Sequence, residues 1–291
     1  MTTLQNKIDF VGLIDVNHAN PNGDPLSGNR PRITSDFLGE ISDVCLKRKI
    51  RNRLLDLDQS ILVQSDDYRK DNFKSIKDRV AGQEALKDFE KKLDEDEFYK
   101  LACATWFDVR SFGQVFAFGK SGDNSKGVSI AVRGPVTIQS AFSVDPVELE
   151  TLQITKSVNN ETTAKGGKSS DTMGLKHRVK YGLYVLKGSI NVQLAELTGF
   201  SEEDAEMLKK ALSQLFANDA SSARPEGSMD LKRLYWFEHN CKLGQYSPAQ
   251  VHNSVVITHK EGVEIPSCFD DYSVHLEALP GLEAEIIDQY C

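Results

Sequence analysis

The chain contains, at residues 42–53, the stretch Ser42-Asp43-Val44-Cys45-Leu46-Lys47-Arg48-Lys49-Ile50-Arg51-Asn52-Arg53. Its apolar residues recur at roughly helical spacing, which predicts a short helix with one side toward a core. Ser42 or Asp43 would cap this helix, because their side-chain oxygens can accept the free amide hydrogens of the first turn. The predicted core-facing positions are Val44, Ile50, Leu54 and Leu57. The helix follows a largely apolar strand predicted at 7–16, which suits a central place in a sheet.

The same helix is strongly basic on another face. Lys47 and Arg51 are four residues apart and so lie together, with Arg48 beside them. No acidic residue between positions 44 and 55 neutralises them. A basic run on one helix is most often a solvated face, but this run begins at a helix N-terminus, whose free N–H groups favour phosphate. It also follows a loop rich in turn residues, 17–32. The stretch therefore indicates a surface for a polyanion.

The composition sets limits on that reading. With 291 residues and 40% hydrophobic content, the chain can form one elaborated domain or two small ones with a real core. Its net charge of −8 argues against indiscriminate binding to nucleic acid. Because solvent screens distant charges, a localised basic groove remains compatible with that value. Much of the acid lies elsewhere, at 94–97, 202–204 and 283–288.

The sequence also predicts the compartment. The N-terminus has no basic segment followed by an apolar run, and no stretch approaches the length of a membrane span. The five cysteines are scattered without a Cys-x-x-Cys pair, which is neither a disulfide framework nor a zinc signature. We expect a cytoplasmic protein with reduced thiols and no membrane partner.

The middle of the chain predicts an insertion followed by aromatic segments. Residues 56–100 are polar and charged, and 75–100 could form a helix outside the sheet. Its loose apolar face would be Ile76, Val80, Leu86, Phe89 and Leu93. Residues 102–118 are predicted to begin helical and end extended. The part from Arg110 to Phe118 loosely resembles the aromatic strand of RNA-recognition modules, but several positions do not match. Core packing is therefore favoured for Phe112, Phe116 and Phe118.

Two later segments leave alternatives open. Gly134-Pro135 breaks a strand predicted at 127–138, and Arg133 at the break is either presented outward by the bend or an ordinary surface arginine. Strands predicted at 152–158 and 179–192 flank a polar, glycine-rich and basic excursion at 159–178, longer than a hairpin needs. Met173 within it could wedge against a base or anchor the loop, and its spacing alone favours the anchor.

The C-terminal part completes the fold class. Residues 201–204 predict the cap of an amphipathic helix that continues to Phe216. Its inward positions would be Ala205, Leu208, Leu212, Leu215 and Phe216. A polar turn follows at 221–224, and further strands are predicted at 231–239 and 254–258. Strands interleaved with two well-separated helices predict an α+β sandwich of the split β-α-β type.

A set of segments in fixed order points to a known family. They are Asn20–Pro25, Asp43–Asn52, Phe107–Gly113, Val132–Val136, Ser143–Pro146, Thr172–His177, Tyr181–Tyr184 and Ser221–Arg224. The chain resembles, through this ordered set, the backbone subunit of CRISPR-associated Cascade complexes in the RAMP superfamily. Within that group it is most similar to the subtype I-C form. The insertion at 56–100 and the C-terminal tail match least well.

The resemblance implies a more detailed α+β fold. It is a modified RNA-recognition (ferredoxin-like) palm with a helical fingers insertion and a protruding β-hairpin thumb. The palm would comprise 1–55, 101–150 and 181–291, the fingers 56–100 and the thumb 151–180. Copies would polymerise along a guide RNA (crRNA), and each thumb would displace one nucleotide of its neighbour's RNA. The implied partners are crRNA, further copies, other Cascade subunits and target DNA, which pairs with the guide.

The resemblance also implies RNA-binding residues. Lys47, Arg48 and Arg51 would bind backbone phosphates, since the Leu-Lys-Arg-x-Ile-Arg pattern occupies the RNA-facing helix of the family. Met173 becomes a plausible wedge instead of an anchor. The other candidates are Arg32, Arg110, Arg133, Lys176, His177, Arg178 and Arg224. The absent aromatic motif then makes sense, because a protein that leaves bases free for pairing should grip phosphates.

An enzymatic alternative rests on two aspartates. Related backbone subunits of type III complexes cut RNA with an aspartate and a divalent metal, and Asp24 and Asp108 would be the carboxylates to test. No Asp-x-Asp or His-Asp pair accompanies either, and Asp24 is expected to stabilise its turn. His239 and Cys241 with His252 fit no established metal-site spacing. We therefore expect no metal and no cofactor.

A third alternative is a self-assembling protein that binds no nucleic acid. Whether the face with Lys47 and Arg51 is basic and unpaired after folding distinguishes it. The sequence favours a non-catalytic RNA-binding scaffold.

Overall fold

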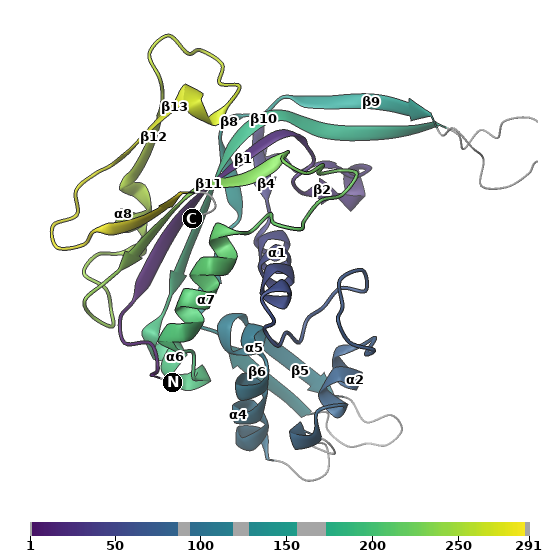
Figure 1. Cartoon of the computed structure of the whole chain (residues 1–291), viewed down its shortest axis with the longest axis vertical. Helices are drawn as coiled ribbons and strands as arrows, with labels where there is room; N and C mark the ends of the chain where they lie inside the picture. Colours follow the sequence, from purple (N-terminus) through teal and green to yellow (C-terminus); the bar gives the residue numbers. More distant parts are fainter. Residues whose placement is uncertain (1, 87–93, 119–127, 156–172, 289–291) are drawn as a thin grey trace, which may run out of the picture.

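One antiparallel sheet organises the molecule. The computed structural model describes residues 2–86, 94–118, 128–155 and 173–288. The main sheet has the strand order β14-β11-β1-β10-β8-β4, and β7 and β9 also pair with β10 (Figure 1). Its strands are β1 (Ile8–Ala19), β4 (Leu38–Ile41), β7 (Val136–Ile138), β8 (Ala141–Pro146), β9 (Leu149–Thr155), β10 (Met173–Ile190), β11 (Met229–Glu238) and β14 (Ala284–Asp288).

Strand β1 lies at the centre, as its apolar sequence predicts. It pairs with β10 from Ile8 opposite Ile190 to Ala19 opposite Val179, and with β11 on its other side. Phe10 and Ile14 belong to the core on one face of the sheet, whereas Val11 and Leu13 belong to the core on the other. Opposite the step from Leu13 to Ile14, β11 has one extra residue, Lys232, so the alternation of β11 moves by one residue there while that of β1 continues. A strand covered on both faces needs a nearly continuous apolar run.

Helices cover one face of this sheet, and a short helix with a small hairpin covers the other. The first layer contains α1 (Asp43–Asp56), α6 (Val192–Thr198) and α7 (Glu202–Ser213). The second contains α8 (Pro248–Asn253) with the hairpin β12 (Val255–His259) and β13 (Tyr272–Leu276) (Figure 1). Helix α7 begins with the predicted capping box, in which Ser201 and Asp204 bond reciprocally. The α+β class predicted from the sequence is confirmed.

A separate apolar cluster holds the part of the chain between residues 62 and 132 together. It combines α2 (Ile76–Ala81), α4 (Glu95–Thr105) and α5 (Phe107–Phe112) with the hairpin β5 (Gly113–Phe118) and β6 (Val128–Arg133). Phe116 is buried there, as predicted, and lies edge-on against Phe98. Phe112 instead packs, half-buried, against the main core. The side chain of Phe118 lies outside the described residues.

Strands β9 and β10 project from the sheet as a two-stranded hairpin (Figure 1). Met173 pairs with Thr155 and Val179 with Leu149. Residues 173–178 are therefore strand, and the prediction of an irregular excursion through residue 178 is wrong for them, because they continue the ladder of β10. Residues 156–172 lie outside the described ranges.

Helix α1 forms where predicted, but its buried side differs. Ser42 caps it by accepting from the Cys45 amide. The predicted core position Val44 is wrong, since its side chain is 68% exposed. The buried apolar side consists of Leu46, Ile50, Leu54 and Leu55. Steps of four residues keep Leu46, Ile50 and Leu54 on one side at 100° per residue, whereas Val44 is six residues from Ile50 and points elsewhere.

Two other predicted helices are shorter than expected. The helix predicted over 75–100 is divided: α2 ends at Ala81, and α4 begins after Asp94, whose side chain accepts from the Glu97 amide. The acidic run at 94–97 therefore supplies a helix N-terminus, where its charge is favourable. Phe89 and Leu93 lie outside the described residues. Helix α7 ends at Ser213 and does not continue to Phe216. Within the described ranges, no helix is long and apolar enough to cross a membrane.

Candidate nucleic-acid interface

Three segments that are far apart in the sequence meet beside helix α1. A polar cavity of about 230 Å³ is lined by residues of the turn at 21–23, of α1 and of the turn at 218–224, and by Asp67 and Tyr68. The Asn22 side-chain oxygen accepts hydrogen bonds from the backbone amide and the hydroxyl of Ser42, at 2.9 and 2.7 Å. The Asn20 amide donates to the Ala223 carbonyl at 2.9 Å. The structure thus places three of the sequence motifs around one cavity.

A cluster of two cations and one carboxylate lies at this cavity. Asp219 pairs with the ammonium of Lys49, and Arg224 Nε lies 3.3 Å from the same carboxylate oxygen. The Lys49 side chain is only 4% exposed and lies over the ring of Phe216. Burial lowers the pKa of Lys49 from its ordinary value, although Asp219 opposes the shift. Lys49 was not predicted from the sequence as a site residue, although it lies three residues after the buried Leu46 and helical spacing places it on the buried side.

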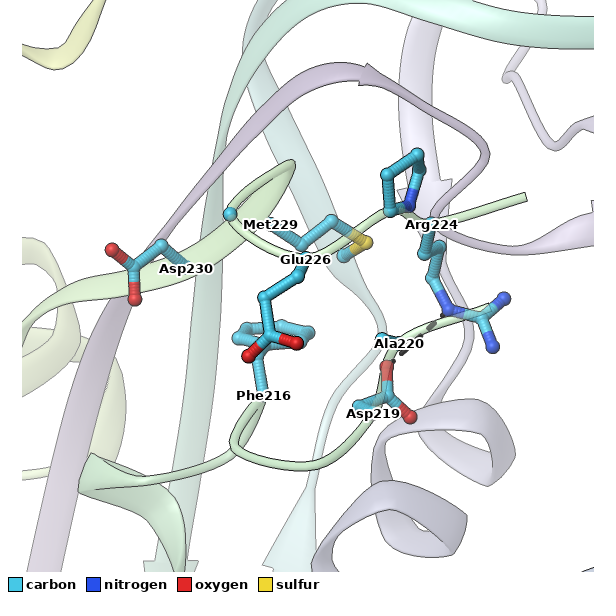
Figure 2. A pocket seen from close by; sticks show the side chains of 9 residues that line it. Phe216, Asp219, Ala220, Arg224, Glu226, Met229 and Asp230 are labelled. Carbon is cyan, nitrogen blue, oxygen red and sulfur yellow. Dashed lines mark hydrogen bonds and ion pairs between the residues drawn. The ribbon is translucent and has the colours of Figure 1, made fainter. Parts of the chain in front are cut away.

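Arg224 also lines a second cavity, of about 220 Å³, together with residues 225–230 (Figure 2). Figure 2 shows the Arg224 guanidinium joined to Asp219 through Nε, with its two outer nitrogens directed away from that carboxylate. Glu226 and Asp230 line this second cavity with Phe216 and Met229. Carboxylates outnumber cations in this cavity, whereas cations outnumber carboxylates in the cavity beside α1, which is therefore the better candidate for phosphate.

The three predicted cations of α1 each have a carboxylate partner. Lys47 Nζ lies 3.0 Å from Asp43, one helical turn earlier. Arg48 donates to both carboxylate oxygens of Asp67, at 3.0 and 3.1 Å. The face is therefore basic but not unpaired. Arg48 and Asp67 are 56% and 70% exposed, and pairs this open to water are weak and exchange readily.

Arg51 is different, because its partner is inside the protein. Arg51 Nε lies 2.9 Å from Asp108, with the two side chains 15% and 0% exposed. The Asp108 carboxylate also accepts from the backbone amides of Leu62 and Val63, at 2.7 and 3.1 Å. Through Asp108, Arg51 therefore joins α1 to α5 and to the segment at 62–63, which follows α1. A phosphate cannot easily replace this structural contact.

Arg110 makes a second buried contact of this kind. Its guanidinium donates to both oxygens of Asp204, at 2.9 and 2.7 Å, and packs over the ring of Phe107. Asp204 belongs to the capping box of α7, so the pair joins α5 to the start of α7. Arg110 is a structural residue in this arrangement, and the structure does not bring it to the cavity beside α1.

The remaining cations lie on two other elements. Arg32 is 3.4 Å from Asp24 in the turn before β4. Arg133, the last residue of β6, is exposed and forms no ion pair with any described residue. An exposed Arg133 fits both interpretations, so the choice between them stays open. Whether it contacts RNA stays a prediction.

The hairpin β9–β10 carries the last group of predicted residues. Met173 is 65% exposed, and Lys176 forms no ion pair within the described ranges. Arg178 lies 2.6 Å from Glu150 on the facing strand. His177 is buried, with Nδ1 2.9 Å from the Thr151 hydroxyl. A groove of about 560 Å³ runs between Met173 and the turn at 27–30. Met173 and His177 thus lie on the same face of the hairpin and both line this groove, Met173 exposed and His177 buried, whereas the half-buried Lys176 lies on the opposite face.

The residues of the enzymatic alternative have other roles. Asp24 accepts from the Leu26 amide at 3.2 Å and from the Ser27 hydroxyl at 2.8 Å, and these bonds lower its pKa. The prediction that Asp24 stabilises its turn is confirmed. Asp108 holds Arg51 and two amides, as described above.

The two histidines considered and rejected as metal ligands form other hydrogen bonds. His239 Nε2 lies 2.9 Å from Asp9, and His252 Nε2 lies 2.9 Å from the Gly188 carbonyl. Over the described ranges, no three His, Cys, Asp or Glu side chains are grouped closely enough to hold a metal ion.

Comparison with known proteins gives the family. The family described as CRISPR-associated protein Cas7 matches residues 6–277. A CRISPR-associated protein Cas7 of Haloferax volcanii is 31% identical over 246 residues, which cover 81% of this chain and 70% of that protein. The chain belongs to the Cas7 family, the family of the backbone subunit of type I CRISPR surveillance complexes.

Solved structures show a more distant likeness. A chain of a "CRISPR RNA-guided surveillance complex, pre-nicking" has a TM-score of 0.48 at 15% identity, covering 86% of this chain and 80% of that one. A chain of a second "CRISPR RNA-guided surveillance complex" has a TM-score of 0.43 at 15% identity, covering 89% and 78%.

Proposed function

We propose that this chain is a non-catalytic, crRNA-binding backbone subunit of a type I Cascade complex, with subtype I-C as the specific form. Membership of the Cas7 family over residues 6–277 is the observation that carries the proposal. The ordered motifs shared with the I-C form support the subtype. The proposed partners are crRNA, further copies of the chain, other Cascade subunits and target DNA bound through the guide, in the cytoplasm.

The structure supports dividing the predicted RNA-binding residues into two groups. Cations that have an exposed or exchangeable partner, no ion pair with a described residue, or free outer nitrogens are proposed to bind phosphates. They are Arg32, Lys47, Arg48, Arg133, Lys176, Arg178 and Arg224. The buried contacts of Arg51, Arg110 and His177 suit residues that hold this surface in shape. We retain Met173 as the wedge, because its long apolar side chain is exposed on a projecting hairpin.

The palm, fingers and thumb assignment is part of the same proposal. The main sheet would be the palm, and the hairpin β9–β10 would be the base of the thumb. The helical cluster would form the fingers, although its buried residues lie on both sides of the proposed boundary at residue 100.

A charge-reversal experiment tests the RNA face. Lys47→Glu with Arg48→Glu should weaken binding of labelled single-stranded RNA at least tenfold at low salt, equally for different sequences, because phosphate contacts carry no sequence information. The salt dependence should flatten by roughly 0.7 in slope for each phosphate that the variant no longer neutralises. We exclude Arg51 from this test, since a glutamate facing Asp108 would unfold the site. Lys242→Glu with Lys260→Glu, on exposed lysines elsewhere, is the matched control. If the two double variants bind RNA with equal affinity, the proposed RNA-binding face is wrong.

The ribonuclease alternative is tested in the same titration. RNA is incubated with the protein with and without Mg²⁺, and both complex size and RNA integrity are read. Intact RNA in large complexes supports the scaffold. Mg²⁺-dependent fragments that disappear in Asp24→Ala would establish the enzyme instead.

A further inference from the structure

Arg224 is fixed at two points in the structure. Its backbone is held by a tight turn, in which the Ser221 amide donates to the Arg224 carbonyl at 2.8 Å and the Arg224 amide donates back at 3.0 Å. Its side chain is held by Asp219 through Nε alone. The two outer nitrogens form no hydrogen bond with described residues and point away from Asp219 (Figure 2). The guanidinium is thus oriented with most of its donors free.

Asp219 is itself fixed by the buried Lys49. The lysine ammonium ties the carboxylate to helix α1, and Asp219 is only 16% exposed. Lys49 also neutralises the carboxylate, so the cluster keeps one net positive charge and attracts a phosphate despite containing an acid. An arginine with a preset guanidinium loses less side-chain entropy when it binds than a free one does.

We propose that Asp219 is a positioning residue for RNA binding, which holds Arg224 so that its outer nitrogens meet a phosphate at the cavity beside α1. This inference rests on the proposed function. It makes a prediction whose sign is unusual. General electrostatics requires that removing a carboxylate from a polyanion-binding surface strengthen binding. Positioning requires that removing this carboxylate weaken it.

The test compares two aspartates near the same face. Asp219→Asn should weaken binding of labelled single-stranded RNA about three- to tenfold, because the Arg224 side chain must then be ordered on binding. Asp67→Asn removes the same charge from an exposed partner of Arg48, and should leave affinity unchanged or raise it up to about fivefold. Asp219→Glu should restore part of the affinity, which a purely structural loss would not allow.

A second variant removes the risk that Asp219→Asn leaves Lys49 buried without a partner. Lys49→Met with Asp219→Asn keeps the net charge and replaces the buried pair by an apolar side chain and an amide, a change that buried pairs often tolerate. Its thermal midpoint is checked first by circular dichroism. RNA affinity should still fall three- to tenfold.

A double-mutant cycle with Arg224→Ala assigns the mechanism. In the Arg224→Ala background, Asp219→Asn should leave RNA affinity unchanged or raise it, because nothing remains to be positioned and only the electrostatic effect of the lost carboxylate is left. The positioning role would be overturned if Asp219→Asn by itself bound RNA more tightly than the wild type. An equal loss of RNA affinity on Asp219→Asn with and without Arg224 would also overturn it. If the wild-type protein binds no RNA although Asp219→Asn remains folded, the proposed function itself has failed. That result differs from the two outcomes that overturn only the positioning role.

Discussion

Arg48 and Arg51 lie one turn apart on the same helix, and each pairs with an aspartate from a distant segment. The Arg48–Asp67 pair is mostly exposed, whereas Asp108 in the Arg51–Asp108 pair is fully buried and bonds two backbone amides as well. The first pair can exchange its carboxylate for a phosphate at small cost. The second cannot open without leaving a buried charge unpaired. Two arginines that look equivalent in the sequence therefore belong to different parts of the protein, one to its surface and one to its interior.

Breaking the buried pair should have the largest effect. Asp108→Ala leaves the Arg51 guanidinium and two amides without their acceptor, and should lower the free energy of unfolding by about 3–5 kcal/mol. Urea denaturation followed by tryptophan fluorescence measures this loss. A loss below about 1 kcal/mol would mean that water reaches the pair, and the distinction between the two arginines would collapse.

A third pair, Arg79 with Asp71, lies between these extremes and gives the pH dependence. Arg79 is buried and donates to both Asp71 oxygens, at 2.6 and 2.9 Å, while Asp71 is partly exposed. The Arg79 hydrogen bond lowers the pKa of Asp71 from its ordinary 3.8. Asp71→Asn should cost about 2 kcal/mol at pH 7.

The sign of its pH dependence follows from the lowered pKa. A carboxylate with a lowered pKa stabilises the folded state above its ordinary pKa, and this contribution is lost as the pH falls through the folded-state value. The difference between wild type and Asp71→Asn should thus be constant from pH 7 to about 5 and shrink below about 4. A difference that grows on acidification would contradict the assignment of the shift to Arg79.

The N-cap of α1 sharpens the comparison within the helix. Ser42→Ala removes the acceptor for the Cys45 amide and should cost about 1 kcal/mol. Hydrogen exchange should increase first in the turn that carries Lys47 and Arg48, because Arg51 remains tied to Asp108. Uniform acceleration along the whole helix would show that the buried pair does not hold its second half.

The exposed pair should give the smallest effect. Arg48→Ala removes one surface ion pair and should change the free energy of unfolding by at most about 1 kcal/mol. Differential scanning calorimetry compares it with Arg51→Ala at matched pH and salt. Similar losses of stability in the two variants would mean that Arg48 holds the interior together as Arg51 does. That result would contradict the distinction based on the exposure of Arg48.

Much of the local structure could be predicted from the sequence. The central strand β1, the capped helices α1 and α7 and the break before Pro135 follow from periodicity, capping residues and proline, which act over a few neighbouring residues. The ordered motifs also led to the family that the Cas7 match establishes. The misplaced Val44 and the overextended helix at 75–100 show the limit, since loose apolar spacing fits more than one helical phase.

Only the tertiary structure decided what each cation does. The sequence places Arg48, Lys49 and Arg51 in one basic run with no acid between positions 44 and 55. Their partners Asp67, Asp219 and Asp108 come from segments 19 to 170 residues away. Ion pairing and burial depend on distances in space, which local spacing does not encode. The sequence by itself determined that this protein has a basic helix on an α+β scaffold. Folding determined which of its charges are free to meet a polyanion and which hold the molecule together.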